Sequence, residues 1–228
     1  SMFYFDYYYL VLVLPTAILS LLAQAWVQSS FRKYSSVQTK KGISGREMAE
    51  KLLSVSDIHN VKVEELAGSL TDHYDPSSKV LRLSQTVFDK RSVAAVGVAA
   101  HEMGHAIQDK VRYSPLVLRS TLVPIANIGS SFGPALAFAG FFFRFGLLIN
   151  IGIILFSCAV LFYLVTLPVE IDASRRALKM LRSTNLLEED ELRGVRSVLT
   201  AAAFTYVASA LTAIASLLRL ILLSRNRK

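Results

Sequence analysis

Four long apolar runs, separated by polar segments, dominate the pattern of this chain. Each run is at least as long as the ~20 residues that cross a bilayer as a helix. A chain of 228 residues has no interior large enough to bury four such helices. The pattern therefore predicts four transmembrane helices, over residues 2–27, 116–143, 145–169 and 197–223.

The first run follows a start rich in tyrosine, including Tyr4 and Tyr7, which suits a membrane interface. The residues before the run carry Asp6 and no positive charge, so we interpret it as a retained anchor and not as a removable signal peptide. Ser1, ahead of Met2, is interpreted as the remnant of a cleaved tag. The second run contains several prolines and glycines and is expected to be kinked.

Residues 28–115 form the main polar portion of the chain. A capping-box pattern at Ser44 opens a short helix that runs through Leu53. Alternating apolar and polar residues predict strands near residues 61–63 and 79–84, within a small sheet of about three strands. Residues 72–78 read as a turn. Val80–Ser84 is the candidate for an exposed edge strand that holds an extended peptide by main-chain hydrogen bonds, and the alternative is ordinary pairing within the sheet.

The sheet is followed by a helix, expected over about residues 92–109, that carries the sequence His101-Glu102-Met103-Gly104-His105. The segment has no proline, is rich in alanine and valine, and begins at Ser92, a suitable N-cap residue. Residues four apart lie on one helix face, so His101 and His105 can bind one divalent ion. The adjacent Glu102 is placed to take a proton from metal-bound water. This HExxH arrangement is typical of zinc hydrolases.

A catalytic zinc ion usually has three protein ligands, so one more residue is required. The candidates are Glu170, Asp172, His59 and His73. Two membrane crossings after the His101–His105 segment, the chain returns to the same side at Glu170. An acidic residue directly after an apolar span also needs a partner, so topology favours Glu170 as the third metal ligand.

Five further residues are open to more than one interpretation, and three of them lie near Glu170 in the sequence. Asp172 is either a ligand or an acceptor that orients a metal-bound histidine. Arg175 and Arg176 either pair with it, stabilise an oxyanion or contact lipid headgroups. Similarly, His73 and Tyr74 are either ordinary turn residues or donors to a tetrahedral intermediate.

Charge and composition narrow the class of protein. The net charge is +8, and the basic residues lie beside the apolar runs and are not interleaved with aromatics in a patch, which argues against a nucleic-acid partner. Most of them flank the catalytic segments, so the positive-inside rule places the site in the cytoplasm of a multi-pass cell-membrane protein. Cys158 is the single cysteine, which excludes an intrachain disulfide.

The chain resembles the YugP-like family of bacterial membrane neutral zinc metallopeptidases. The matching stretches are Leu70–Pro76, Lys79–Ser84, His101–His105 and Leu167–Ser174. The resemblance implies a zinc peptidase in which His101, His105 and Glu170 are ligands and Glu102 is catalytic. The chain also resembles HtpX-like membrane proteases, which share the membrane-embedded helix with the His-Glu motif. These proteases carry an aspartate four residues after the ligand glutamate, where this chain has Ser174.

We therefore expect a mainly α-helical integral membrane protein with about four transmembrane helices and a small α+β zinc-peptidase portion. Residues 28–115 and 170–196 form its water-exposed part. The expected function is a zinc-dependent endopeptidase with a Zn²⁺ cofactor, a protein or peptide substrate and the lipid bilayer as partners. The alternative is a catalytically silent membrane scaffold or chaperone-like protein with a structural metal site. The sequence indicates neither a substrate nor an oligomeric state.

Overall fold

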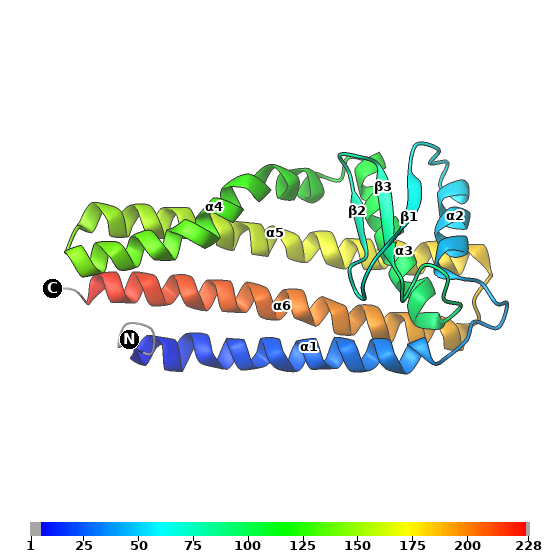
Figure 1. Cartoon of the computed structure of the whole chain (residues 1–228), viewed down its shortest axis with the longest axis horizontal. Coiled ribbons are helices and arrows are strands. Elements are labelled where there is room, and N and C mark those ends of the chain that lie inside the picture. Colours follow the sequence, from blue (N-terminus) through cyan, green and yellow to red (C-terminus); the bar gives the residue numbers. More distant parts are fainter. Residues whose placement is uncertain (1–5, 227–228) are drawn as a thin grey trace. The chain divides into compact units, whose positions relative to one another are not determined.

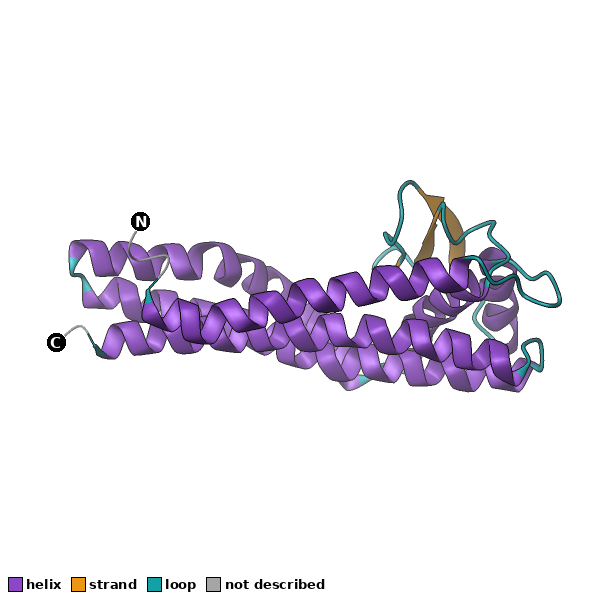
Figure 2. Ribbon diagram, turned by 90° about the horizontal axis from the view of Figure 1, so that it is seen from below, coloured by secondary structure: helices purple, strands orange, loops and turns teal. Residues whose placement is uncertain are grey.

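The computed structural model describes residues 6–226 and is mainly helical, with strands confined to one small sheet (Figure 2). The interpretations of Ser1 and Tyr4 and the first residues of the span expected at 2–27 lie outside the described part. The elements are a π-helical turn Tyr9–Val13, α1 Leu14–Ser35, α2 Gly45–Val55, β1 Lys62–Leu66, β2 His73–Asp75, β3 Val80–Ser84, α3 Val93–Lys110, α4 Ser114–Phe143, α5 Gly146–Thr184 and α6 Glu189–Arg225.

Within residues 6–226, four helices are long and apolar enough to cross a membrane, as the sequence predicts. They are the first helical segment Tyr9–Ser35, α4, α5 and α6. The chain divides into two compact units, which are described separately (Figure 1). The helical unit comprises Ser1–Gln24, Val117–Pro168 and Phe204–Lys228. The mixed unit comprises Ala25–Leu116 and Val169–Ala203 and contains α2, α3 and the sheet.

In the helical unit, α4 and α5 pack with their backbones in contact. A Cβ atom on Gly129 would lie 2.1 Å from the carbonyl oxygen of Leu155, and one on Gly152 would lie 2.5 Å from that of Gly133. Small residues permit this close approach of membrane helices. The long helix α4 changes direction along its length (Figure 1), as expected for a helix with two internal prolines, Pro124 and Pro134.

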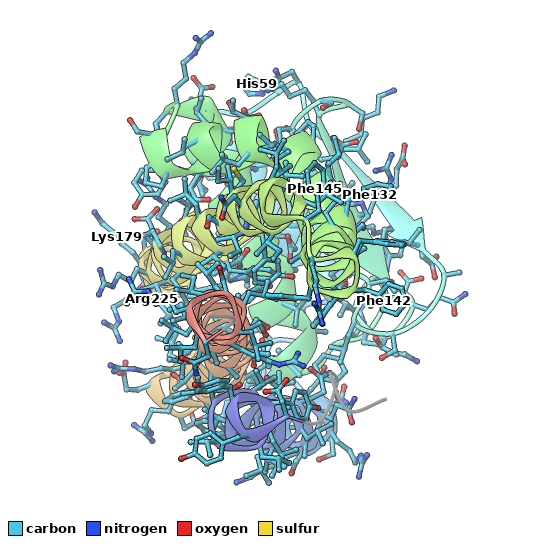
Figure 3. The ribbon with its side chains drawn as sticks, turned by 90° about the vertical axis from the view of Figure 1, so that its left-hand side faces the viewer. His59, Phe132, Phe142, Phe145, Lys179 and Arg225 are labelled. Atoms are coloured by element: carbon cyan, nitrogen blue, oxygen red, sulfur yellow. The ribbon has the colours of Figure 1, made fainter. Side chains whose placement is uncertain are left out.

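Large apolar side chains cover the outside of the helical unit. Phe132, Phe142 and Phe145 are 60%, 76% and 51% exposed, and Figure 3 shows them on its surface. Exposed aromatic residues at this density are typical of surfaces that face lipid or another protein. This unit therefore has the surface that a bilayer requires.

The core of the mixed unit is formed by α2, α3 and β3. The side chains of Met48, Leu52, Leu81, Leu83 and Met103 are fully buried there. The predicted cap of α2 is confirmed, since its N-cap serine accepts a hydrogen bond from the backbone N–H three residues later. The core fixes α3 on one side of the sheet, next to β2 and β3 (Figure 1).

The sheet has the strand order β1-β3-β2, with β1 parallel and β2 antiparallel to β3. Because β3 is paired on both sides, Val80–Ser84 is not an exposed edge strand, and the alternative of ordinary pairing within the sheet is confirmed. Four of its five residues are buried, which is the pattern of a central strand. The predicted turn at 72–78 also contains a short strand, β2, whose pairing with β3 the local sequence does not reveal.

Helix α5 continues without interruption from the apolar run into the polar segment beyond it. Pro168 lies inside this helix and does not begin a new one. A proline is tolerated inside a membrane helix where neighbouring groups satisfy the backbone that it frees. As a result, Glu170 and the residues that follow it project from one continuous helix.

Candidate metal centre

Helix α3 holds His101 and His105 one turn apart inside the mixed unit. Ser92 caps the helix by accepting a 3.1 Å hydrogen bond from Ala95 N–H. The alanine- and valine-rich first half is buried in the core, which fixes the direction of the helix. The two imidazole side chains are 13% and 8% exposed, so they lie in a largely water-excluded place.

Helix α5 brings Glu170 to these histidines through close backbone packing. A Cβ atom on Gly104 would lie only 2.3 Å from the carbonyl oxygen of Ala173. Any residue other than glycine at position 104 would hold the two helices apart. The glycine inside the His101–His105 segment therefore places α5 near enough for Glu170 to reach both imidazoles.

The carboxylate of Glu170 contacts both rings through a single oxygen. Its Oε2 atom lies 2.9 Å from His101 Nε2 and 3.2 Å from His105 Nε2. The two rings are nearly perpendicular, at 88°. Three ligands placed about 2.0 Å from a tetrahedral zinc ion are separated by roughly 3.3 Å, so these distances fit zinc binding. Among the described residues, these three form the group whose donor atoms lie within 4.8 Å of one another.

Gln108 fixes which ring nitrogen of His105 carries the proton. Its Nε2 group donates to the carbonyl oxygen of Val169 at 2.8 Å and to Asp172 Oδ2 at 2.9 Å, which are both acceptors. Its Oε1 atom therefore accepts from Nδ1–H of His105, at 2.9 Å. In the neutral imidazole this leaves a lone pair on Nε2 directed at the carboxylate of Glu170. Two facing lone pairs require a cation between them, so the donor set fits a bound metal ion.

Ser174 contacts the other imidazole, with its Oγ atom 2.9 Å from His101 Nδ1. It lies one turn after Glu170, at the position where HtpX-like proteases have an aspartate. A serine hydroxyl can accept the Nδ1 proton and so direct Nε2 towards Glu170. Both histidines are thus oriented by a polar side chain from their own helix or from α5.

Asp172 is not a member of the group of potential ligands. Its Oδ2 atom contacts Gln108 and, at 2.6 Å, the Nε atom of Arg176. Arg176 in turn lies 5.4 Å from the ring centre of Tyr113. Asp172 therefore acts on His105 only through Gln108, a residue that the sequence analysis missed. The signal was present, because Gln108 lies three residues after His105 and thus on the same helix face.

The remaining candidates for the third metal ligand, His59 and His73, do not join this group. His59 is exposed at the surface (Figure 3) and contacts Asp57 at 2.6 Å. His73 is exposed and contacts the carbonyl oxygen of Thr71. Neither histidine belongs to the group around Glu170.

Tyr74 is buried, and its hydroxyl is bonded within the fold. The hydroxyl donates a 2.5 Å hydrogen bond to Asp109 Oδ2, which also pairs with Lys79. Burial and the neighbouring Asp109 carboxylate raise the pKa of Tyr74 above its usual value. Tyr74 therefore ties β2 to the end of α3 and is not placed as an oxyanion donor.

Glu102 lies next to the first histidine on α3 and is 8% exposed. A nearly buried carboxylate is uncommon unless it has partners, and Glu102 does interact with its surroundings. It directly follows His101 in the sequence, which is the position of the catalytic base expected from the HExxH pattern. The helix therefore supplies two potential ligands and a potential base within five residues.

Comparison with known proteins gives two matches. The model of a family described as "Putative neutral zinc metallopeptidase" matches residues 9–225. A protein of Bacillus subtilis (strain 168), named "Putative membrane protease YugP", is 44% identical over 218 residues, which cover 96% of this chain and 97% of that protein. No solved structure matches the chain.

Proposed function

This chain belongs to the family described as "Putative neutral zinc metallopeptidase", whose model matches residues 9–225, and we propose that it is a membrane-embedded, zinc-dependent endopeptidase. One observation carries the proposal: the Nε2 atoms of His101 and His105 both face one oxygen of Glu170. These three residues would hold Zn²⁺. The relative named as a membrane protease and the four apolar helices support the same assignment.

When bound, zinc polarises a peptide carbonyl and lowers the pKa of a water molecule to about 7. The side chains of this chain supply the proton transfers. Glu102 accepts a proton from the attacking water and passes it to the leaving amine. Gln108 and Ser174 hold the imidazoles with Nε2 inward, so no rearrangement of the ligands is needed during the reaction. The low exposure of the site excludes other water and strengthens these electrostatic interactions.

The proposal includes a location and a class of partner. A multi-pass protein of the cell membrane contacts the lipid bilayer, and an endopeptidase acts on protein or peptide substrates. The basic residues around the mixed unit favour the cytoplasmic side for the site, by the positive-inside rule.

The test compares wild-type protein with the Glu102→Gln variant, both purified as full chains in detergent. Zinc content is measured by mass spectrometry and cleavage is measured on casein, an unfolded substrate. We expect both proteins to contain one zinc ion per chain and cleavage to fall by about 10²-fold or more in the variant, because the base is lost. Glu50→Gln, on the exposed face of α2, is the matched control and should cleave like wild type.

The opposite outcome is equally informative. If neither wild type nor variant cleaves casein or its own chain while zinc is retained, the metal site is structural and the scaffold alternative holds. If wild type retains no zinc, the assignment of the three ligands is wrong.

A further inference from the structure

A cavity of about 890 Å³ lies in the mixed unit, lined by residues that the proposed peptidase site does not use. Its lining comes from the end of α1, the loop before β2 and the segment that precedes α3. Three cations line it, Arg32, Lys90 and Arg91, and one carboxylate, Asp89. Ser92, the lining residue nearest to the metal centre in the sequence, precedes His101 by more than two helical turns.

Two of these cations have no partner of their own. Arg91 forms a 2.9 Å ion pair with Glu47. Within residues 6–226, by contrast, the structure gives neither Arg32 nor Lys90 a side-chain hydrogen bond or ion pair. Asp89 has no side-chain partner within these residues either, so the exposed side chains of Arg32, Lys90 and Asp89 together carry a net charge of +1, which favours an anion.

The walls of the cavity are held in place by other contacts. Gln38 and Ser92 pair as an isolated β-bridge, which forms one wall. On the other side, Thr86 Oγ1 lies 3.4 Å from Ser69 Oγ, and the backbone N–H of Ser84 donates a 2.7 Å hydrogen bond to Asp72. These contacts hold the backbone of the segments that line the cavity.

The position of the cavity on α1 identifies the kind of anion. From Tyr9 to Phe31 this helical segment carries no charge, and Arg32 and Lys33 follow in its last turn. Phe31 and Arg32, which both line the cavity, therefore lie where an apolar span meets water. That boundary is the depth of the phosphate groups of a bilayer.

The rim adds an apolar contact at the same place. Leu70 is 41% exposed and adopts a left-handed backbone conformation, with φ of 57°. A bulky residue rarely takes this conformation, so the loop presents an apolar side chain at a conformational cost. A phospholipid-binding site combines cations that bind the phosphate with apolar groups that contact the acyl chains.

We propose that this cavity binds the phosphate headgroup of a membrane phospholipid through Arg32 and Lys90. Leu70 and Phe31 contact the first part of its acyl chains. The proposal does not depend on the peptidase assignment, because none of these residues contacts the metal centre.

The test measures lipid retention by the full chain in detergent, using native mass spectrometry. Phosphatidylglycerol is titrated against diacylglycerol with the same acyl chains, which lacks only the phosphate headgroup. We expect wild type to retain the first and not the second. In Arg32→Gln/Lys90→Gln, retention of phosphatidylglycerol should weaken by about tenfold or more, because two charge-assisted hydrogen bonds are lost.

Two variants control for general effects of charge and folding. Lys33→Gln removes the neighbouring cation, which lies 5.3 Å from the centre of the Tyr34 ring and does not line the cavity, and should bind lipid like wild type. Arg32→Lys keeps the charge and should retain most of the affinity. If the double variant loses its helical circular dichroism, the single variants Arg32→Gln and Lys90→Gln are compared instead, and each should weaken retention several-fold.

Three results would overturn the proposal. The first is equal retention of phosphatidylglycerol and diacylglycerol. The second is equal weakening in the Lys33→Gln control and in the cavity variants. The third is displacement of the lipid by millimolar glycerol 3-phosphate, which would show that the cavity takes a soluble phosphate compound and not a membrane lipid.

Discussion

The Oε1 atom of Gln108 lies 2.9 Å from Nδ1 of His105, and the two residues come from the same face of α3. Because the amide of Gln108 is itself held by Val169 and Asp172, it fixes which nitrogen of the imidazole faces Glu170. In the proposed metal centre, Gln108 is thus a positioning residue that acts through the proposed ligand His105.

Gln108→Leu is therefore expected to weaken zinc binding by about 10- to 100-fold, the usual effect of removing a partner of a metal-bound histidine. The dissociation constant is measured by competition with a fluorescent chelator. Gln85→Leu, at an exposed position, serves as the control. Unchanged zinc affinity in Gln108→Leu would show that the helix alone orients His105.

Gly104 sets the separation of α3 and α5. In Gly104→Ala the new methyl group would meet the carbonyl oxygen of Ala173 at 2.3 Å, so backbone must shift, at a cost of roughly 1–3 kcal/mol. We expect both a lower melting temperature and weaker zinc binding, since Glu170 moves with α5. Gly97→Ala is the control, because the nearest atoms to its methyl group would belong to the side chain of Val195, at 3.1 Å, and not to a backbone carbonyl. Equal effects of the two substitutions on zinc affinity would contradict this account.

In the helical unit, Asp6 forms a partly buried ion pair with Arg219. The Nε and Nη2 atoms of Arg219 lie 2.9 Å and 2.7 Å from Asp6 Oδ2, and the guanidinium also lies 5.3 Å from the ring centres of Tyr9 and Phe138. Removing Asp6 leaves the buried guanidinium of Arg219 without its counter-charge, which costs roughly 1–3 kcal/mol for a pair that is only partly buried. Asp6→Asn should therefore lower the melting temperature in detergent.

The double variant Asp6→Asn/Arg219→Gln should be less destabilised than the sum of the two single variants, because it leaves no lone charge. Arg182→Gln is the matched control. Arg182 pairs with Glu189 at 3.3 Å, but both side chains are about two-thirds exposed, so the loss should stay below about 1 kcal/mol. Additive effects of the two single substitutions would show that the Asp6–Arg219 pair does not stabilise the helical unit.

Tyr74 is expected to make the mixed unit less stable as the pH becomes alkaline. Burial and the hydrogen bond to Asp109 raise its pKa, so the folded protein keeps the phenol proton at a pH where the unfolded chain loses it. This contribution to stability is complete below about pH 10, the ordinary pKa of tyrosine, and is lost as the pH rises above it. Tyr74→Phe lacks the contribution and loses about 1 kcal/mol at neutral pH.

The difference in melting temperature between wild type and Tyr74→Phe should therefore narrow between pH 8 and about pH 10.5, measured by circular dichroism. Tyr34→Phe, at a half-buried position whose hydroxyl has no hydrogen bond within residues 6–226, should melt near wild type at pH 8. A gap for Tyr74→Phe that widens with pH would show that the tyrosine is not held in its protonated form.

The proposed orientation is tested with single cysteines in a Cys158→Ala background. Ser77 lies in an exposed turn of the mixed unit, and Arg144 lies in the exposed turn between α4 and α5. If the site faces the cytoplasm, a membrane-impermeant maleimide should label Arg144→Cys in intact cells and label Ser77→Cys only after lysis. The reverse pattern would place the metal centre on the outside.

The sequence by itself was sufficient for the features that depend on neighbouring residues. Runs of apolar residues long enough to span a bilayer predicted four helices, and the structure has them. The cap at Ser44 and the helix that carries His101 and His105 followed from equally local patterns. Such features are readable because capping and helical periodicity act within one or two turns.

Only the tertiary structure decided which residues from distant parts of the chain meet. The sequence left four candidates for the residue that joins His101 and His105, and close packing at Gly104 brings Glu170 to them. It also left open whether Val80–Ser84 lies at a sheet edge or is paired on both sides, since alternation within one strand does not specify its neighbours. The roles of Gln108 and Ser174 became visible only through their distances to the imidazole rings, because a hydrogen bond between helices depends on how their backbones approach.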